Sequence, residues 1–425
     1  MMTLNRKIAP TPLPLDKFNL ARASSAQLSN GAGIHFINLG EQKVVRIEFV
    51  LNAGTWTELE KGQSYLALKM LNEGTSKLNS TELAEYIASY GAFLEFNHGV
   101  DRINITLYSL EKHLHILIEL VFNLFNDSKF SESDLVNLKN ITKQGLKVNF
   151  EKTAFVATRL FRENLFGTTH PYGSNFDVHD IEQISQKSIF SFYNQFLKGY
   201  NHLNIFVSGS YDQDGVYHIL NKYFGQNATS QIEQKKYLRN TNLDKNITLN
   251  KEGALQTSIR LGQSVMNRNH PDYQKFLVVN ELLGGFFGSR LMKNIREDKG
   301  FTYGIGSSIN VFEHEAYLVI GTDVKKEVTS QTYEEIAKEI KILQTALVPE
   351  EELDIVKNYI LGSFMGSINT PFSLIDKFKT LYYNNLTYDY YDRYYEVVTN
   401  ITAENIKEIA EEYLNFDEMI KVSVG

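Results

Sequence analysis

Two stretches of the chain repeat one another, ISQKSIFSFYNQFL at Ile184–Leu197 and ITAENIKEIAEEYL at Ile401–Leu414. Each predicts an amphipathic helix with a Ser or Thr near its start and an aromatic–Leu pair at its end. Each helix leads to a short apolar strand that ends in Gly, NIFVSG at Asn204–Gly209 and IKVSVG at Ile420–Gly425. The matched core positions keep one constant offset; they are Ile184, Ile189, Phe196 and Leu197 with Ile401, Ile406, Tyr413 and Leu414. Such an offset indicates a duplicated domain.

A second pair of segments supports the duplication. Tyr65–Leu78 and Phe276–Leu291 both predict an apolar helix that breaks at Gly and resumes at Ser-(Lys/Arg)-Leu. The polar stretch Gly225–Lys245 separates the two halves. The sequence therefore predicts an N-terminal domain at 1–224, a linker at 225–245 and a C-terminal domain at 246–425.

Both halves contain strands and helices without strict alternation. Strands are expected from Lys43, Arg102, Thr257 and Ala316, and helices of 3.6-residue period at Leu114–Phe125, Gln331–Leu347 and Glu350–Phe364. This order predicts an α+β fold of two homologous domains, each a mainly antiparallel sheet covered by helices.

Composition narrows the class of protein. The chain has 425 residues, a net charge of −7, 43% hydrophobic residues and no Cys. It therefore lacks the excess of positive charge that is typical of nucleic-acid-binding proteins. Without Cys it cannot form a disulfide or a Cys-ligated metal site. The N-terminus has no apolar run long enough for a signal peptide, and no segment is apolar enough to insert in a membrane. We expect a cytoplasmic protein, or a periplasmic one if the chain is a mature form.

The candidate catalytic residues lie in one stretch, GGFFGSRLMKNIREDKGFTYG at Gly284–Gly304. It places Arg296 and Tyr303, a charged and a phenolic donor, just after a glycine-rich loop. Such a pair can hold a peptide carbonyl or the oxyanion that forms from it. The alternative is structural, with Arg296 paired to Glu297 or Asp298 and Tyr303 at a strand edge. The length of the string favours the functional interpretation.

The repeated halves, the helices that break at Gly and the Arg-(x6)-Tyr string together resemble the insulinase/pitrilysin-type metallopeptidases. The resemblance runs from about Asn30 to Gly425 and is nearest to the bacterial, mitochondrial-processing-peptidase-like branch. Further landmarks are LNAGTWTE from Leu51, NEGT from Asn72, LFGTTHPYG from Leu165 and LGGFFGSRL from Leu283.

The resemblance implies a zinc site that this chain lacks. Active members carry His-x-x-Glu-His on a first-domain helix, with two His as zinc ligands and the Glu as activator of the bound water. The three positions here hold Tyr65, Leu68 and Lys69. The family's third ligand, a later Glu, corresponds to the stretch Ile141–Lys147, which has no acidic residue. We therefore expect no metal bound by this chain.

The other histidines do not suggest a replacement site. His113 and His115 are two residues apart and face different sides of a helix, and His314 is alone in FEHEA. A self-sufficient peptidase with other ligands is therefore disfavoured.

In the family, Arg and Tyr at the places of Arg296 and Tyr303 hold the substrate carbonyl opposite the zinc. Gly284, Gly285 and Gly288 are either a helix end and tight turn or a substrate-facing loop, and the sequence leaves both open. The first hypothesis is a non-zinc subunit that pairs with a homologous zinc-bearing subunit and supplies Arg and Tyr for peptide hydrolysis. Zn²⁺ is then expected in the partner, this chain is inactive alone, and it could form a homodimer when isolated. The alternative is a catalytically inactive peptide-binding or structural scaffold.

Overall fold

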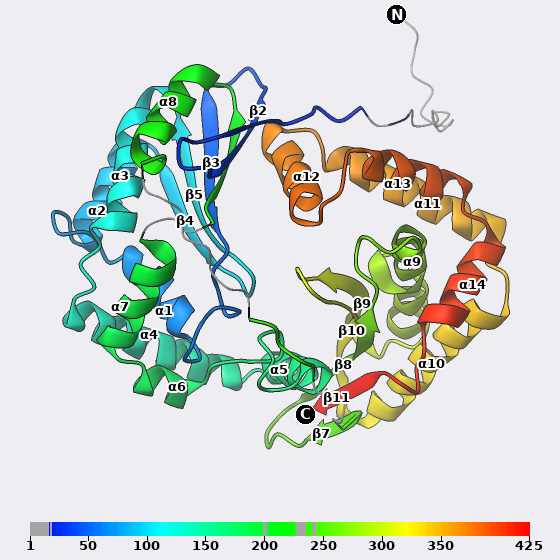
Figure 1. Ribbon diagram of the computed structural model, residues 1–425. Helices are drawn as coiled ribbons and strands as arrows, with labels where there is room; N and C mark the ends of the chain where they lie inside the picture. Colours follow the sequence, from blue (N-terminus) through cyan, green and yellow to red (C-terminus); the bar gives the residue numbers. More distant parts are fainter. Residues whose placement is uncertain (1–16, 18, 199–201, 227–234, 240–243) are drawn as a thin grey trace, which may run out of the picture.

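The computed structural model describes residues 17, 19–198, 202–226, 235–239 and 244–425, so part of the expected linker at 225–245 lies outside the described residues. Figure 1 shows two lobes, each a sheet with helices on its outer side. The α+β class with two repeated, helix-covered, mainly antiparallel sheets is confirmed. Among the described residues, none of the helices is both long and apolar enough to cross a bilayer.

The first sheet has the strand order β1-β2-β6-β3-β5-β4. All neighbours are antiparallel except β2 and β6. Its strands are β1 (Ser24–Gln27), β2 (Gly33–Asn38), β3 (Val44–Leu51), β4 (Phe93–His98), β5 (Ile103–Leu110) and β6 (Asn204–Gly209).

The second sheet has the order β7-β11-β8-β10-β9, and here β7 and β11 are the parallel pair. Its strands are β7 (Asn246–Leu249), β8 (Gln256–Val265), β9 (Thr302–Val311), β10 (Ala316–Lys325) and β11 (Ile420–Val424). Apart from β1, the two sheets have the same order and the same parallel pair. The duplication seen in the sequence is thus a duplication of topology.

Most helices cover the outer face of the sheet in their own half. The helices of the first half are α1 (Gln63–Leu71), α2 (Ser80–Ser89), η1 (Glu111–His113), α3 (Leu114–Asn126), α4 (Glu132–Phe150), α5 (Thr153–Phe166), α6 (Val178–Gln183), α7 (Gln186–Phe192), η2 (Tyr193–Leu197) and α8 (Gln213–Phe224). In the second half they are α9 (Tyr273–Asn280), η3 (Glu281–Gly285), η4 (Met292–Asp298), η5 (Lys326–Val328), α10 (Thr329–Thr345), α11 (Glu350–Gly366), α12 (Pro371–Tyr383), α13 (Asp389–Asn400) and α14 (Ala403–Tyr413).

The polar residues before the repeated helices act as caps. Ser185 accepts a hydrogen bond from the Ser188 N–H, and Thr402 accepts one from the Asn405 N–H, so both helices begin where the sequence predicts. Each helix then buries its apolar side, including Ile189 in the first half and Ile406 in the second.

The two halves exchange helices. Helix α5 packs on β8 and β11 of the second sheet, while α12 packs on β2 and β6 of the first. The α5 contact is apolar and aromatic, with Phe161 and Phe166 beside Tyr317. The halves are therefore joined by packing as well as by the chain connection.

The α12 contact combines apolar packing, in which Ile375 and Phe378 lie against Phe206, with a buried ionic network. Arg46 of β3 makes a bidentate pair with Asp376, with nitrogen–oxygen distances of 2.8 and 3.2 Å. It also lies 3.1 Å from Glu48, and Lys379 lies 2.6 Å from the same Glu48. Arg46 and Glu48 are both buried, so each charge depends on the other members of the network.

Candidate functional site

Helix α1 carries the three positions that hold zinc chemistry in the peptidases. Leu68 is fully buried in the core of the first half. Tyr65 packs its ring against Phe176 and His98, with centroid distances of 5.2 and 5.7 Å. The Lys69 ammonium lies 5.9 Å from the centre of the Tyr65 ring. Tyr65 and Lys69 thus line the cavity, while Leu68, between them on the same helix, is buried in the core.

The stretch that corresponds to the third zinc ligand lies at the same cavity. Thr142 of α4 lines the cavity together with Tyr65, and burial raises the pKa of this tyrosine. Thr142, Gly145 and Leu146 of α4 line the same cavity as Tyr65 and Lys69. The fold thus brings the four positions together, but Tyr, Leu, Lys and an acid-free stretch of α4 are not a zinc-binding set. The residues present do not fit the metal.

The space at this place is a cavity of about 770 Å³. Its walls come from α1, α4, α5, the end of β4 and the loop at 174–176. Besides the residues above, the lining includes Thr55, Glu58, Glu73, His98, Phe155, Arg159, Arg162 and Phe176.

A hydrogen-bonded chain of three polar side chains adjoins this cavity. Ser64 Oγ donates to Glu58 Oε2 at 2.7 Å and lies 2.7 Å from His98 Nε2. Burial raises the pKa of Glu58 to about 7, against the hydrogen bonds from Ser64 and Gly62 that lower it. Burial, assisted by the charge of Lys69, lowers the pKa of His98 to about 4. At neutral pH His98 is therefore neutral.

The sequence alone did not identify Glu58, Ser64 and His98 as a group. Glu58 and Ser64 are separated by a glycine turn at Gly62, and His98 comes from the end of β4. No short motif joins the three residues, so only the fold brings them together.

Arg296 and Tyr303 do come together, as the sequence predicts. Arg296 lies on η4 and Tyr303 at the start of β9. The Arg296 guanidinium lies 5.0 Å from the centre of the Tyr303 ring and 4.7 Å from that of Phe287. Tyr303 is 90% exposed and Phe287 63% exposed. Within the described residues Arg296 has no carboxylate within ion-pair distance, so the alternative pairing with Glu297 or Asp298 is absent.

The three glycines before this pair differ in their surroundings. A Cβ at Gly284 would lie 2.8 Å from the Ser307 backbone nitrogen and 2.7 Å from its Oγ. At Gly285 it would meet the Glu281 carboxyl group, and at Gly288 the Phe286 ring. Gly284 therefore allows the loop to approach β9 closely. Contact of these glycines with a substrate stays a prediction.

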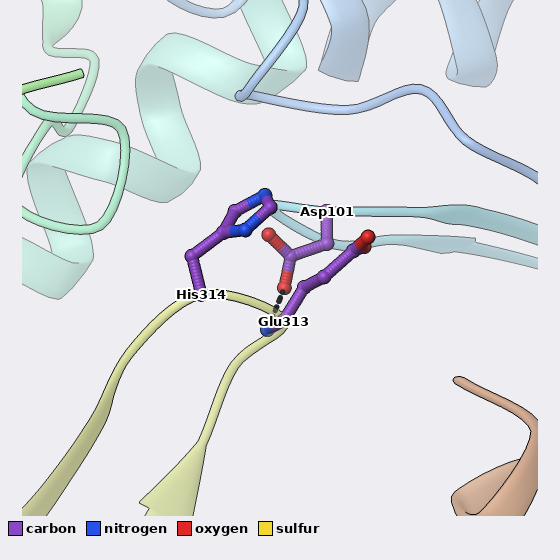
Figure 2. A group of neighbouring side chains, drawn as sticks. All are labelled: Asp101, Glu313 and His314. Carbon is purple, nitrogen blue, oxygen red and sulfur yellow. Dashed lines mark hydrogen bonds between the residues drawn. The ribbon is translucent and has the colours of Figure 1, made fainter. Parts of the chain in front are cut away.

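His314 is not isolated, in contrast to its place in the sequence. Figure 2 shows it beside Asp101 and Glu313, where the β9–β10 hairpin meets the β4–β5 turn of the first half, and the ligand atoms of the three lie within 4.8 Å of one another. The carboxylates already have partners: Asp101 accepts from the Tyr172 hydroxyl and the Glu313 N–H, and Glu313 pairs with Arg102. The group joins the two halves by hydrogen bonds and an ion pair.

Sequence profiles of one family match most of the chain. A profile for "Insulinase (Peptidase family M16)" matches residues 36–170, and one for the "Peptidase M16 inactive domain" matches residues 183–360. The first match contains α1, and the second contains both Arg296 and Tyr303.

Individual relatives agree with these profiles. The Bacillus subtilis protein "Probable inactive metalloprotease YmfF" is 23% identical over 272 residues, which are 62% of each chain. The "Uncharacterized zinc protease YmxG" of the same organism is 24% identical over 398 residues, 89% of this chain and 92% of that one. The crystal structure of a Pseudomonas fluorescens peptidase M16 inactive domain aligns with a TM-score of 0.84 at 22% identity, covering 95% of this chain and 98% of that one. With its zinc positions replaced, the chain belongs to the insulinase (M16) peptidase family as an inactive homologue.

Proposed function

We propose that this chain is the non-zinc subunit of a two-chain peptidase and supplies Arg296 and Tyr303 to a peptide held by a homologous zinc-bearing subunit. The observation that carries the proposal is the Arg296 side chain, a cation stacked against Tyr303 and Phe287 with no carboxylate partner in the described part of the chain. An arginine kept for stability would be expected to pair with an acidic residue, and two acidic residues follow it directly in the sequence.

The exposure of the pair supports the same role. Tyr303 presents its hydroxyl to solvent, and the guanidinium beside it offers several N–H donors. A peptide carbonyl, or the oxyanion that forms at it, is stabilised by two such donors when they are already positioned. Gly284 supports this positioning because it lets the loop before η4 pack closely on β9.

In this proposal the partner subunit supplies the zinc ion and the water that attacks the peptide. The positions on α1 do not form a zinc set, so the metal and the activated water would come from a chain that retains His-x-x-Glu-His. Relatives named as an inactive metalloprotease and as a zinc protease, both from one organism, are consistent with paired chains of the two kinds.

The test is to mix the purified chain with the zinc-motif homologue of the same organism and to measure cleavage of a quenched fluorescent peptide. We expect little cleavage by either chain alone and clear cleavage by the mixture. Arg296→Ala should lower kcat of the mixture by about a hundredfold, which is typical for removal of one oxyanion donor. Tyr303→Phe, which removes only the hydroxyl, should lower it in the same direction.

Lys293→Ala is the matched control, because Lys293 is an exposed cation on the same helix, η4. It should leave the rate of the mixture unchanged. If Arg296→Ala and Tyr303→Phe also leave it unchanged, the proposal fails and the alternative of a peptide-binding or structural scaffold is favoured.

A further inference from the structure

A small cavity lies where the two halves of the molecule meet. It has a volume of about 140 Å³, and its lining includes Asn52, Asp101 and His202 from the first half and Glu313 and His314 from the second. Imidazole nitrogens, carboxylate oxygens and amide oxygens are the usual non-sulfur ligands of metal ions in proteins. The cavity offers all three kinds, and only contact between the halves brings them together.

Three of these side chains approach one another closely. One ligand atom of each of Asp101, Glu313 and His314 lies within 4.8 Å of the other two, and Figure 2 shows the three side chains around one point. Around an ion with bonds of about 2.1 Å, two ligand atoms are at most about 4.2 Å apart. Small rotations of the side chains would therefore allow all three to share one ion.

The partners of the two carboxylates leave lone pairs for an ion. Asp101 accepts one hydrogen bond at each oxygen, from the Tyr172 hydroxyl and from the Glu313 N–H, and a carboxylate oxygen has two lone pairs. Glu313 pairs with Arg102 through Oε2. Hydrogen bonds of this kind orient the carboxylate ligands in metal sites, so they are compatible with binding.

Asn52 provides an independent sign of a ligand at this place. Its Oδ1 is buried and has no hydrogen-bond partner in the part of the chain that the structure describes. Asn52 follows β3 directly and lines the same cavity as His314. A buried amide oxygen without a partner is unfavourable, and a cation in the cavity would supply the missing partner.

The charges at the cavity leave room for a cation. Asp101 and Glu313 carry two negative charges, and Arg102 balances one of them through its ion pair with Glu313. The Arg102 guanidinium is held 3.6 Å from the centre of the Tyr383 ring, on α12. Lys235 also lines the cavity, but it is exposed, so water solvates its ammonium group.

We propose that Asp101, Glu313, His314 and Asn52 bind one divalent transition-metal ion that links the two halves. Three oxygens with one imidazole suit an ion such as Mn²⁺, whereas Mg²⁺ and Ca²⁺ prefer ligand sets made of oxygen alone. None of the four residues lines the cavity beside α1, so the site is separate from the replaced zinc positions. Because both halves contribute ligands, the ion stabilises the folded chain.

The experiment titrates the untagged, metal-free full chain with Mn²⁺ and follows the electron paramagnetic resonance signal of the free ion. We expect one Mn²⁺ to bind per chain. The midpoint of thermal unfolding should rise with the Mn²⁺ concentration, because the ion binds the folded state and not the unfolded chain. Mg²⁺ at the same concentration should neither displace Mn²⁺ nor raise the midpoint.

Two variants place the ion in this cavity. His314→Phe keeps an aromatic ring against Trp56, whose centroid lies 4.3 Å away, but removes the nitrogen ligand. It should weaken Mn²⁺ binding about a hundredfold, since loss of a group that only orients a ligand already costs about 10–100-fold. Asn52→Leu, which removes the amide oxygen, should weaken binding about tenfold, because water can replace a neutral oxygen ligand.

His115→Phe is the matched control, because His115 is an exposed histidine on α3 outside the cavity. It should bind Mn²⁺ as wild type does. Arg296→Ala and Tyr303→Phe should do the same, so the result is independent of peptide cleavage by the two-chain mixture.

Three outcomes would overturn the proposal. One is the absence of stoichiometric Mn²⁺ binding by the wild-type chain. Another is an unchanged affinity in His314→Phe or in Asn52→Leu, which would place the ion elsewhere. The third is binding that leaves the thermal midpoint of the wild-type chain unchanged, which would show that the ion does not link the halves.

Discussion

The two halves of this molecule share one topology and differ in what they present at equivalent places. In the first half, α1 lines a cavity where the peptidases hold zinc, and Lys69 there has no carboxylate at ion-pair distance among the described residues. In the second half, the corresponding helix α9 runs through η3 into a closely packed loop, and Arg296 and Tyr303 follow at the surface. The two halves thus share one scaffold. The first half has no zinc-binding set of side chains on α1, and the second half presents the hydrogen-bond donors Arg296 and Tyr303.

The same comparison holds for the exchanged helices. Helix α5 joins the second sheet through aromatic packing, whereas α12 joins the first sheet through apolar packing and, in addition, a network of buried charges. Equivalent helices therefore stabilise the molecule by different interactions, and variants of each can be compared directly.

The largest effect is expected at α5. Phe161 is 1% exposed and packs against Tyr317 of the second sheet. Phe161→Ala should lower the free energy of unfolding by about 3–5 kcal/mol, measured by urea denaturation. Ile375→Ala on α12, equally buried, should cost about 2–5 kcal/mol. Phe190→Ala, at a 44% exposed side chain, is the control. A loss below that of Phe190→Ala would show that α5 does not hold the halves together.

The ionic contact provides the second comparison. Arg46→Met removes the guanidinium that pairs with both Glu48 and Asp376, and leaves Glu48 buried with Lys379 as its partner. Breaking a buried pair in this way should cost about 3 kcal/mol in urea denaturation. Arg46→Met combined with Glu48→Leu should restore part of the loss, because the buried carboxylate that has lost one of its two cationic partners is also removed. A double variant that is less stable than the single one would contradict this account of α12.

Much of this architecture could be predicted from the sequence. Short stretches of sequence with characteristic spacing indicate the duplication, the replaced zinc positions and the Arg296–Tyr303 pair. In the structure the residues of each stretch lie where that spacing predicts. The helix exchange could not be predicted, because an amphipathic pattern shows which face of α5 is apolar but not which sheet covers it. Likewise Ser64 lies on α1 and His98 at the end of β4, with α2 between them in the chain, and His314 meets Asp101 only through contact between the halves.

A buried histidine makes the α12 contact sensitive to acid. His35 of β2 lies against Phe206 and Tyr382, and burial lowers its pKa from 6.5 to about 4. Because the folded state keeps His35 neutral, its contribution is complete above pH 6.5 and is lost as the pH falls toward 4. The loss should reach at most about 3 kcal/mol.

His35→Phe should flatten this part of the stability profile, measured as the urea midpoint between pH 7 and pH 4. His98 and His170 also have pKa values lowered to about 4, so the variant should remove only part of the acid sensitivity. An unchanged slope in His35→Phe would mean that the imidazole is already charged or hydrated in the folded state.

The smallest effects compare a glycine in each half. A Cβ at Gly284 would lie within 2.8 Å of the Ser307 backbone nitrogen, so Gly284→Ala requires η3 to move away from β9 and should cost about 1–3 kcal/mol. Gly145 of α4 has nothing within 4 Å of its Cβ position, and Gly145→Ala should stabilise the helix by about 0.5–1 kcal/mol. Gly284→Ala should also lower activity of the two-chain mixture, because η4 and Arg296 follow the same loop. Equal effects of Gly284→Ala and Gly145→Ala on stability would mean that the close approach of the loop to β9 does not set the position of Arg296. The backbone at Gly284 in the second half would then be no more constrained than the backbone at Gly145 in the first.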